Sequence, residues 1–493
     1  MYSYNPFRSW TAEKPEPSTK KDFLKLSDLI EFFFIAHPKS GTREGEEHER
    51  VMFYYPENET IDKKTDITGF AIAIVHFTDD FTNKEDRLLS SSEYDHRYVT
   101  SKNCFEIVIQ IEKGEFLMGI ALNRQSCLKN GYFVHLPTVK AILAKTYETY
   151  RLFYGTFISL FNQNLETFKE RIGTFFAHYL SILRVNQIPF LDLFSGVDFM
   201  QLSSLEFLSV QCLVNRCIEE FSCIEKIICL YQDQLMQYSV EKSDLIVLFR
   251  YLTQNLIPNA LQNELQPGGA KKKSISESHI GKFITGSIDF FGKENGGAEN
   301  EGPTFPIVYL TSNENANGLP TLDAYHLVAY RALNTTMCMF VKTVTPEFLQ
   351  QLEDFLDPEL CKLGSMIGDK VSNAPRNAQN DMSFYFIYFN PDSLSLKTNF
   401  SSPYSTSSST NVPLPPKSIY KLACETLEHF FDEKEEFVQV QVKDESDWWV
   451  VVKKINERIL ILFIPNTAPS TIVDIHDTVT NIVKTYFANM FII

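Results

Sequence analysis

The stretch SDLIEFFFIA, Ser27–Ala36, decides how the amino-terminal part of the chain folds. It is an apolar run with the length of a buried strand. A second run, RVMFYY at Arg50–Tyr55, follows after a polar connection, and a proline closes each run. The two runs therefore predict a pair of central strands joined by a loop.

The connection GTREGEEHER, Gly41–Arg50, holds two glycines, four acids, one histidine and two arginines. It could be a phosphate cradle, a metal cluster or a hairpin loop. It lacks the glycine spacing of a nucleotide loop, and adjacent ligands such as those at 46–49 rarely converge on one cation. We predict a solvated hairpin loop in which Gly41 and Gly45 allow the backbone turns, with no metal and no cofactor. The alternative is a contact with a partner protein through Arg43, Glu44, Glu46 and Glu47.

Composition points to a folded protein of several domains. The chain has 493 residues, of which 44% are hydrophobic and 13% aromatic. This length suits two to four domains of ~100 to 200 residues. The formal charge of −16 argues against a broad nucleic-acid-binding surface, so no nucleic acid is expected. The excess of acidic residues either keeps the protein soluble or suits the binding of a basic partner.

The sequence offers little for membrane insertion or disulfide bonding. The start, MYSYNPFRSW, has no basic region followed by an apolar core, and the longest apolar runs are shorter than the ~20 residues that cross a bilayer. We therefore expect any membrane contact to be peripheral. The nine cysteines contain no C-x-x-C pair, which predicts buried free thiols in a reducing cytosol.

One small α/β pattern, of the order β-β-α-β-β-α-α, recurs three times along the chain. The predicted domains are 24–190, 191–372 with a flexible insertion at about 264–304, and 380–493 with a disordered loop at about 400–416. In the first unit we expect a helix at Asp66–Phe81, strands at Tyr94–Val99 and Cys104–Ile111, and helices at Leu136–Phe161 and Leu165–Leu183.

The later units follow the same order. The second is predicted to hold a hairpin at Glu225–Tyr238, a helix at Glu241–Leu256, strands at Pro306–Thr311, Tyr325–Tyr330 and Thr336–Val341, and a helix at Pro346–Ile367. The third is predicted to hold strands at Met382–Asn390, Glu436–Val442, Trp448–Ile455 and Arg458–Ile464, with helices at Lys417–Asp432 and Thr471–Phe491.

Catalytic motifs are missing from the sequence. The nearest match to a phosphate-binding Walker loop, SESHIGKF, has Ser276 in place of the first glycine and Phe283 in place of the hydroxyl residue. No H-E-x-x-H, G-x-S-x-G or kinase signature occurs. No covalent catalysis is therefore expected.

The predicted helix at 66–81 is apolar on two sides. The spacing of Ile67, Phe70, Ile74, Phe77 and Phe81 predicts one stripe that faces a sheet. We expect the opposite side to face a partner protein, although the chain's own later helices could cover it, or GFAIAIVHF could be a buried strand. The residues on that opposite side are Thr68, Ile72, Val75, His76 and Asp79.

Two other features suggest contacts. Trp448 and Trp449 must point to opposite faces of a strand, so one fills a core while the other packs under a flanking helix or meets a partner. A loop at Lys271, Lys272 and Lys273 could contact anionic lipid, each lysine contributing ~1 kcal/mol, or could simply be solvated.

Four stretches together resemble the Ccz proteins, named for caffeine, calcium and zinc sensitivity. They are GTREGEEHERVMFYYP (41–56), LYQDQLMQYSVEKSDLIVLFRYL (230–252), FYFIYFN (384–390) and SDWWVVVKK (446–454). The resemblance runs from about residue 24 to the carboxyl terminus. It implies a tri-longin protein: three longin (roadblock-like) domains of the α/β (α+β) class, each with a mostly antiparallel five-stranded sheet flanked by helices.

The resemblance also implies a function. Ccz proteins pair with a Mon-type longin subunit to form a guanine nucleotide exchange factor for the late-endosomal and vacuolar Rab GTPase, and a third, scaffold-like subunit is thought to join in animals. This implies a cytoplasmic protein recruited to late endosomes, lysosomes or vacuoles, and autophagosomes through anionic lipids. The rivals are a longin scaffold without exchange activity, a subunit of a related exchange complex for lysosome-related organelles and, more distantly, a small-molecule enzyme.

Overall fold

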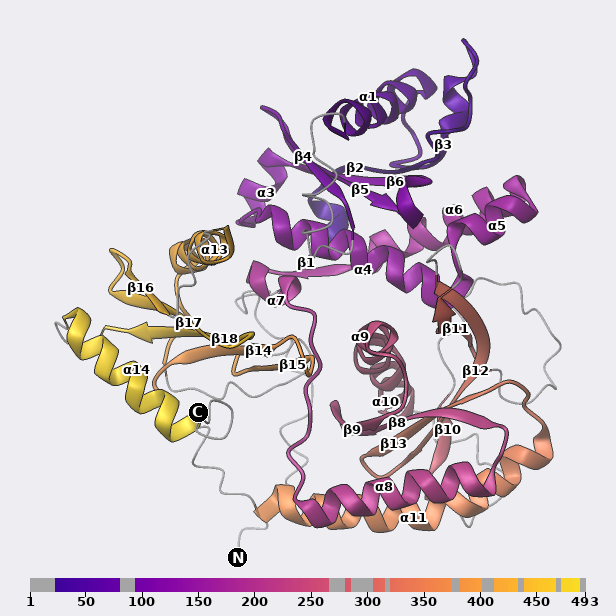
Figure 1. Cartoon of the computed structure of the whole chain (residues 1–493), viewed down its shortest axis with the longest axis vertical. Coiled ribbons are helices and arrows are strands. Elements are labelled where there is room, and N and C mark those ends of the chain that lie inside the picture. The colour runs from indigo at the N-terminus through magenta and orange to yellow at the C-terminus, as the bar shows by residue number, and fades with distance from the viewer. Residues whose placement is uncertain are drawn as a thin grey trace, which may run out of the picture.

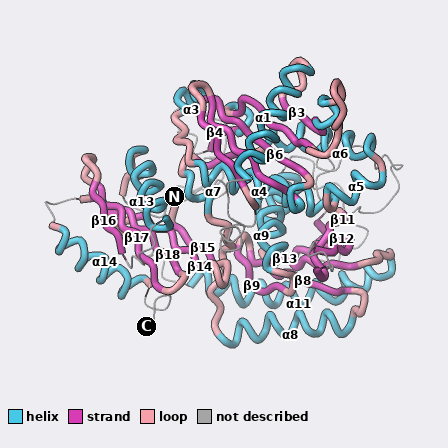
Figure 2. Tube along the Cα trace, turned by 45° about the horizontal axis from the view of Figure 1, so that its top comes forward, coloured by secondary structure: helices cyan, strands magenta, loops and turns pink. Residues whose placement is uncertain are grey.

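The chain folds into three α/β units, each built on its own antiparallel sheet (Figure 1). The structure, a computed structural model, describes residues 23–79, 94–265, 280–284, 305–314, 320–373, 382–400, 412–432, 439–466 and 471–487. Figure 2 shows the three groups of strands apart from one another, with helices around each. The α/β prediction of three sheet-and-helix units is confirmed.

The first unit has a five-stranded sheet in the order β3-β2-β6-β5-β4. Helix α1 covers one face, and α4 and α6 cover the other (Figure 1). The strands are β2 (Ile30–Ala36), β3 (Val51–Tyr55), β4 (His96–Thr100), β5 (Cys104–Ile111) and β6 (Phe116–Asn123). The helices are α1 (Ile61–Asp79), α3 (Arg124–Asn130), α4 (Leu136–Tyr154), α5 (Phe157–Gln163) and α6 (Leu165–Ile182).

Two expectations for this unit were wrong. The apolar run of β6 was not predicted, yet it is the central strand between β2 and β5. The helix expected at 136–161 is two helices, because Gly155 has a φ of +79° and ends α4. The buried carboxylate of Glu112 then accepts hydrogen bonds from the amides of Phe157 (2.5 Å) and Ile158 (2.8 Å), which start α5.

The second unit has a six-stranded sheet instead of the expected five strands. The extra strand, β10, lies inside the predicted flexible insertion, and the carboxylate of Asp357 holds its start by accepting from the amide of Gly281 at 2.6 Å. The strands are β8 (Ile224–Tyr231), β9 (Gln234–Tyr238), β10 (Lys282–Ile284), β11 (Ile307–Glu314), β12 (Pro320–Ala332) and β13 (Thr335–Val341). The helices are α8 (Ser204–Glu220), α9 (Lys242–Tyr251), α10 (Ile257–Leu265) and α11 (Pro346–Asn373), with a π-helical segment (Leu252–Leu256) between α9 and α10.

The third unit has a five-stranded sheet with one helix on each face. Trp448 packs on the α13 side and Trp449 on the α14 side, and both are buried, so the interpretation of a core residue plus a flanking helix is confirmed. The elements are β14 (Tyr385–Asn390), β15 (Ser395–Thr398), β16 (Gln439–Lys443), β17 (Trp448–Ile455), β18 (Arg458–Pro465), α13 (Lys417–Asp432) and α14 (Ile472–Tyr486). Most of the predicted disordered loop, 401–411, lies outside the described residues.

The first unit joins the other two. On the α4 side, Phe153 enters the core of the second unit, where its ring centroid lies 4.9 Å from that of Tyr251. After α6, the short strand β7 (Arg184–Asn186) pairs with β1 (Phe23–Lys25), and α7 (Pro189–Leu193) follows. Phe190 of α7 lies in the core of the third unit. The three units therefore share buried surfaces.

The cysteines agree only in part with the prediction. All nine are free, and Cys127, Cys217, Cys229, Cys338 and Cys424 are buried. Cys212 and Cys223 are exposed, so the expectation of buried thiols is wrong for them. Within the described ranges, no helix has the length and apolar character needed to cross a bilayer.

Candidate functional site

Helix α1 packs on the sheet with the opposite face to the one predicted. Thr68, Ile72 and Val75, expected to face a partner, are 1%, 6% and 5% exposed and contact the sheet. Phe70 and Phe77, expected to face the sheet, are 53% and 66% exposed. The orientation of the predicted partner surface is therefore wrong. Of that surface His76 is exposed and Asp79 ends the helix, while Phe81 of the stripe expected to face the sheet lies outside the described residues.

The aromatic residues of the sheet explain this orientation. Phe32, Phe34 and Tyr54 cover the face beneath α1, and the rings of Phe32 and Tyr54 stack with centroids 6.1 Å apart. A helix can approach such a layer closely only with small or branched side chains, because interiors pack near crystal density. Thr68 and Ala71 meet this need, and the Thr68 hydroxyl donates to the carbonyl of Lys64 at 2.9 Å. The larger phenylalanines are consequently directed outward.

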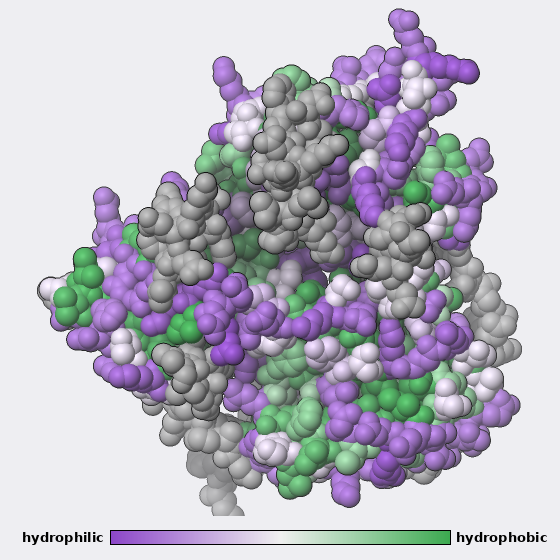
Figure 3. Space-filling model, viewed as in Figure 1, coloured by the Kyte–Doolittle hydropathy of each residue, from purple (hydrophilic) through white to green (hydrophobic). Residues whose placement is uncertain are grey.

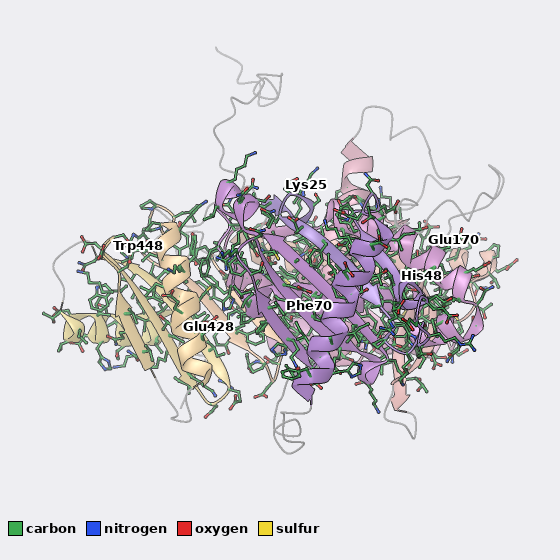
Figure 4. The ribbon with its side chains drawn as sticks, turned by 90° about the horizontal axis from the view of Figure 1, so that it is seen from above. Lys25, His48, Phe70, Glu170, Glu428 and Trp448 are labelled. Atoms are coloured by element: carbon green, nitrogen blue, oxygen red, sulfur yellow. The ribbon has the colours of Figure 1, made fainter. Side chains whose placement is uncertain are left out.

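The outer face of α1 is an exposed apolar stripe. Phe70 and Ala73 lie on one side of the helix with Asp66, and Ile61 near its start is 67% exposed. Figure 4 looks down on this helix, with Phe70 on the side towards the viewer. Exposed aromatic side chains that gather on one helix face are typical of a protein–protein contact. We name Asp66, Phe70, Ala73 and Phe77 the α1 outer face.

Strand β3 lies beside α1 and ends the sheet. Its inner edge pairs with β2, with Phe34 opposite Tyr54, whereas none of the described strands pairs with its outer edge. An open edge presents backbone N–H and C=O groups that can bind a strand of another chain. The β3 edge and the α1 outer face therefore form adjoining parts of one surface.

The loop at 41–50 lies between β2 and β3, as predicted. Gly41 and Gly45 have φ values of +54° and +90°, which confirms their role in the turns. Arg50 ties the loop together, because its Nη2 donates to the carbonyl of Gly41 at 2.9 Å. Backbone amides of Glu47 and Gly45 donate to the Glu47 carboxylate and lower its pKa. A partner contact by Arg43, Glu44, Glu46 and Glu47 stays a prediction; Arg43 and Glu44 are exposed, and the other two are half-buried.

Three buried polar groups, one of them Nε2 of Gln110, lie on the α1 side of the sheet without hydrogen-bond partners among the described residues. The other two are the Tyr54 hydroxyl and Oε1 of Glu106. Burial raises the pKa of Glu106 to about 7, and burial with the nearby carboxylates of Glu59 and Glu31 raises the pKa of Tyr54. Sequence reasoning missed Glu106, because an acid within a strand carries no signal of its burial. Because the pKa of Glu106 is raised, we expect the stability of this sheet to depend on pH.

The remaining predicted residues are not brought to this surface. Lys271, Lys272 and Lys273 lie outside the described residues, so the lipid contact stays a prediction. In the described part of the chain, no three His, Cys, Asp or Glu side chains are arranged to hold a metal ion. A second exposed apolar patch lies on α8, where Leu205 and Leu208 are 72% and 56% exposed; Figure 3 shows hydrophobic side chains gathered there.

Comparison with known protein families identifies all three units as longin domains. Residues 30–155 match the "First Longin domain of INTU, CCZ1 and HPS4". Residues 224–357 and 380–482 match "Intu longin-like domain 2" and "Intu longin-like domain 3". Nearly the whole chain also aligns with a "Vacuolar fusion protein CCZ1 homolog" of Nematostella vectensis at 28% identity, over 95% of this chain and 99% of the relative.

The chain belongs to the Ccz family of tri-longin proteins. Proteins with the same printed name occur in Xenopus laevis (27% identity, 93% of this chain and 96% of the relative) and in Dictyostelium discoideum (22% identity, 94% and 98%). The likeness spans nearly the full length of the chain and of these relatives, so the resemblance noted in the sequence is confirmed. The α1 outer face and the β3 edge both belong to the first longin domain.

Proposed function

We propose that this Ccz-family chain acts in vacuolar fusion and vesicle trafficking by pairing with a second, Mon-type longin subunit. The observation that carries the proposal is the pair of adjoining unsatisfied surfaces on the first longin domain. Phe70 is 53% exposed on α1, and the neighbouring strand β3 ends the described sheet. The relatives of this chain are named vacuolar fusion proteins, which supports a role in vacuolar fusion.

The pairing would join two sheets through β3. A strand added to an open edge gives backbone hydrogen bonds, and side chains above it give specificity. Because α1 lies next to β3, the same approach brings the α1 outer face of this chain against or beside the partner. Burial of one exposed phenylalanine stabilises such a contact by ~1.5–3 kcal/mol.

The proposed activity of the pair is guanine nucleotide exchange on the late-endosomal Rab GTPase. No covalent step is needed. A surface that binds the nucleotide-free GTPase more tightly than the loaded form must weaken nucleotide binding by the same factor. In this proposal, the exposed acids of the 41–50 loop, such as Glu44, contact a basic surface of the partner or the GTPase. A third scaffold subunit and anionic lipids would complete the recruited assembly.

The test is release of a fluorescent GDP analogue from the late-endosomal Rab. It is measured with this chain alone, with the Mon-type subunit alone and with both. We expect acceleration only with both, and loss of acceleration with Phe70→Asp. The matched control is Leu208→Asp, which changes an equally exposed apolar residue on α8.

The outcomes separate the proposed function from its rivals. Stable pairing without acceleration of the Rab would refute exchange and favour a longin scaffold. Acceleration of a Rab of lysosome-related organelles instead would favour the related exchange complex. If the chain and the Mon-type subunit fail to pair at all, the proposed use of β3 and α1 is wrong.

A further inference from the structure

A cavity of about 340 Å³ lies between the first two longin domains, away from the α1 outer face and the β3 edge. The first domain contributes Thr149 of α4 and Tyr179 of α6, together with Arg184 of β7. The second contributes Arg250 of α9 and the π-helical segment. Figure 1 shows α9 and α10 beneath α4, where the two domains meet.

The cavity carries positive charge that its lining does not neutralise. Arg184 and Arg250 both line it, and no Asp or Glu is among the described residues that form its wall. Within the described part of the chain, Arg184 makes no side-chain hydrogen bond or ion pair, and Arg250 makes only one bond, from Nε to Oε1 of Gln254 at 3.2 Å. That bond orients the guanidinium while its other N–H groups stay available.

A third cation increases the positive potential. Lys145, one helical turn before Thr149 on α4, is half-buried, and burial together with the charge of Arg250 lowers its pKa to about 8. Its Nζ donates to the backbone carbonyl of Asp192, so this lysine is held near the cavity wall. The opposing charges are Asp192 and Glu148; the Asp192 carboxylate is already occupied by the backbone and side-chain amides of Asn186 at 2.7 Å.

The rest of the wall suits a small polar ligand. Gln254, Asn255 and Asn259 supply amide groups, while Val247 and Pro258 supply apolar surface. Gln254 and Asn255 belong to the π-helical turn at 252–256, a rare form that is frequently found at functional sites. The π turn brings both amides to the same cavity as Arg250.

We propose that this cavity binds a phosphomonoester or a similarly small phosphate-bearing anion. Two guanidinium groups match the charge of about −2 that a phosphomonoester carries near neutral pH. Arginine forks bind phosphate oxygens by paired hydrogen bonds, and the amides complete the recognition of a polar carrier. The volume lies at the small end of ligand pockets, which run from ~300 to 1,000 Å³. Because residues of both domains form the wall, the bound anion holds the two domains together.

The test uses the full chain and three soluble probes: inorganic phosphate, pyrophosphate and inositol trisphosphate, with chloride at matched ionic strength as the blank. Binding is followed by titration calorimetry and by the thermal unfolding midpoint. We expect saturable binding of at least one probe and a higher midpoint. The double variant Arg184→Gln/Arg250→Gln should lower the affinity at least tenfold. Arg216→Gln, which removes an exposed arginine from α8, should leave it unchanged.

Vesicles distinguish the source of the phosphate. If vesicles containing a phosphoinositide bind the wild-type chain but not the double variant, and inositol trisphosphate does not bind, the phosphate belongs to a lipid headgroup. The double variant should unfold at or above the wild-type midpoint without ligand, because removing two cations from the wall of one cavity relieves repulsion. Absence of saturable binding by every probe and vesicle, or equal binding by the double variant, overturns the proposal. Neither result bears on exchange activity.

Discussion

Replacing Phe70 or Ile72 with aspartate should give opposite outcomes, although the two residues are only two positions apart on α1. Ile72 is 6% exposed and packs on the aromatic face of the first sheet, whereas Phe70 is 53% exposed on the outer face. Ile72→Asp therefore tests the fold, and Phe70→Asp tests the proposed partner surface.

The expected losses follow from burial. Removing the Ile72 side chain loses ~1.5–3 kcal/mol of apolar burial, and an aspartate there must either bury an unpaired charge or stay protonated. Ile72→Asp should thus lose about 4 kcal/mol or more of unfolding free energy. Phe70→Asp loses burial of only half a ring, ~1 kcal/mol. In the complex, loss of the whole phenylalanine contact should weaken pairing by about 10- to 100-fold.

The assay compares thermal unfolding and partner affinity for both variants. For a domain of the size of the first unit, 1 kcal/mol shifts the midpoint by roughly 2–4 °C, so Ile72→Asp should lower the unfolding midpoint of this unit by ~10 °C or prevent it from folding. Phe70→Asp should keep a near-normal midpoint and bind the Mon-type subunit weakly. A wild-type midpoint for Ile72→Asp would refute the orientation of α1. Wild-type affinity for Phe70→Asp would refute its place in the interface.

Two further predictions concern the sheet beneath α1. Burial raises the pKa of Glu106 from 4.5 to about 7, so the folded chain binds this proton more tightly than the unfolded chain, and stability should fall by up to about 3 kcal/mol between pH 4.5 and 7. Glu106→Gln should remove that fall in urea unfolding measured at pH 5 and pH 8; a pH profile parallel to wild type would contradict it. Gly119→Ala should cost about 1–3 kcal/mol, because a Cβ there would lie 2.2 Å from the Phe34 ring, whereas Gly173→Ala on α6, with open space around it, should stabilise by about 1 kcal/mol. Equal unfolding midpoints in urea for the two glycine variants would count against this packing.

Regular elements with a strong local pattern could be predicted from the sequence. The bounds of β5, β17 and α13 are those expected from periodicity and turn residues. The missed elements lack such patterns in isolation. Strand β6 is interrupted by Gly119, whose role becomes clear only when Phe34 lies opposite it on β2. Strand β10 has three residues and depends on the distant Asp357 carboxylate for its position.

The sequence indicated α1 as part of a candidate surface, but it did not indicate which residues of the helix point away from the sheet. Apolar side chains surround α1, so helical periodicity alone could not tell which side packs inward. The deciding information lies in Phe32, Phe34 and Tyr54, which fill the sheet face before the helix docks. In the sequence alone, these aromatic residues indicate only that the segments form strands. Their effect on α1 arises from packing in three dimensions.

The same packing explains why the first longin domain exposes a large apolar side chain on α1. Because the rings beneath α1 accept only small or branched side chains, Phe70 stays exposed, at a cost in solubility that a chain acting alone would have no reason to retain. The neighbouring strand β3, whose outer edge pairs with none of the described strands, is a second feature of this kind. An isolated domain could remove both features by ordinary substitutions. In the proposed pairing, a second longin sheet covers the two features together.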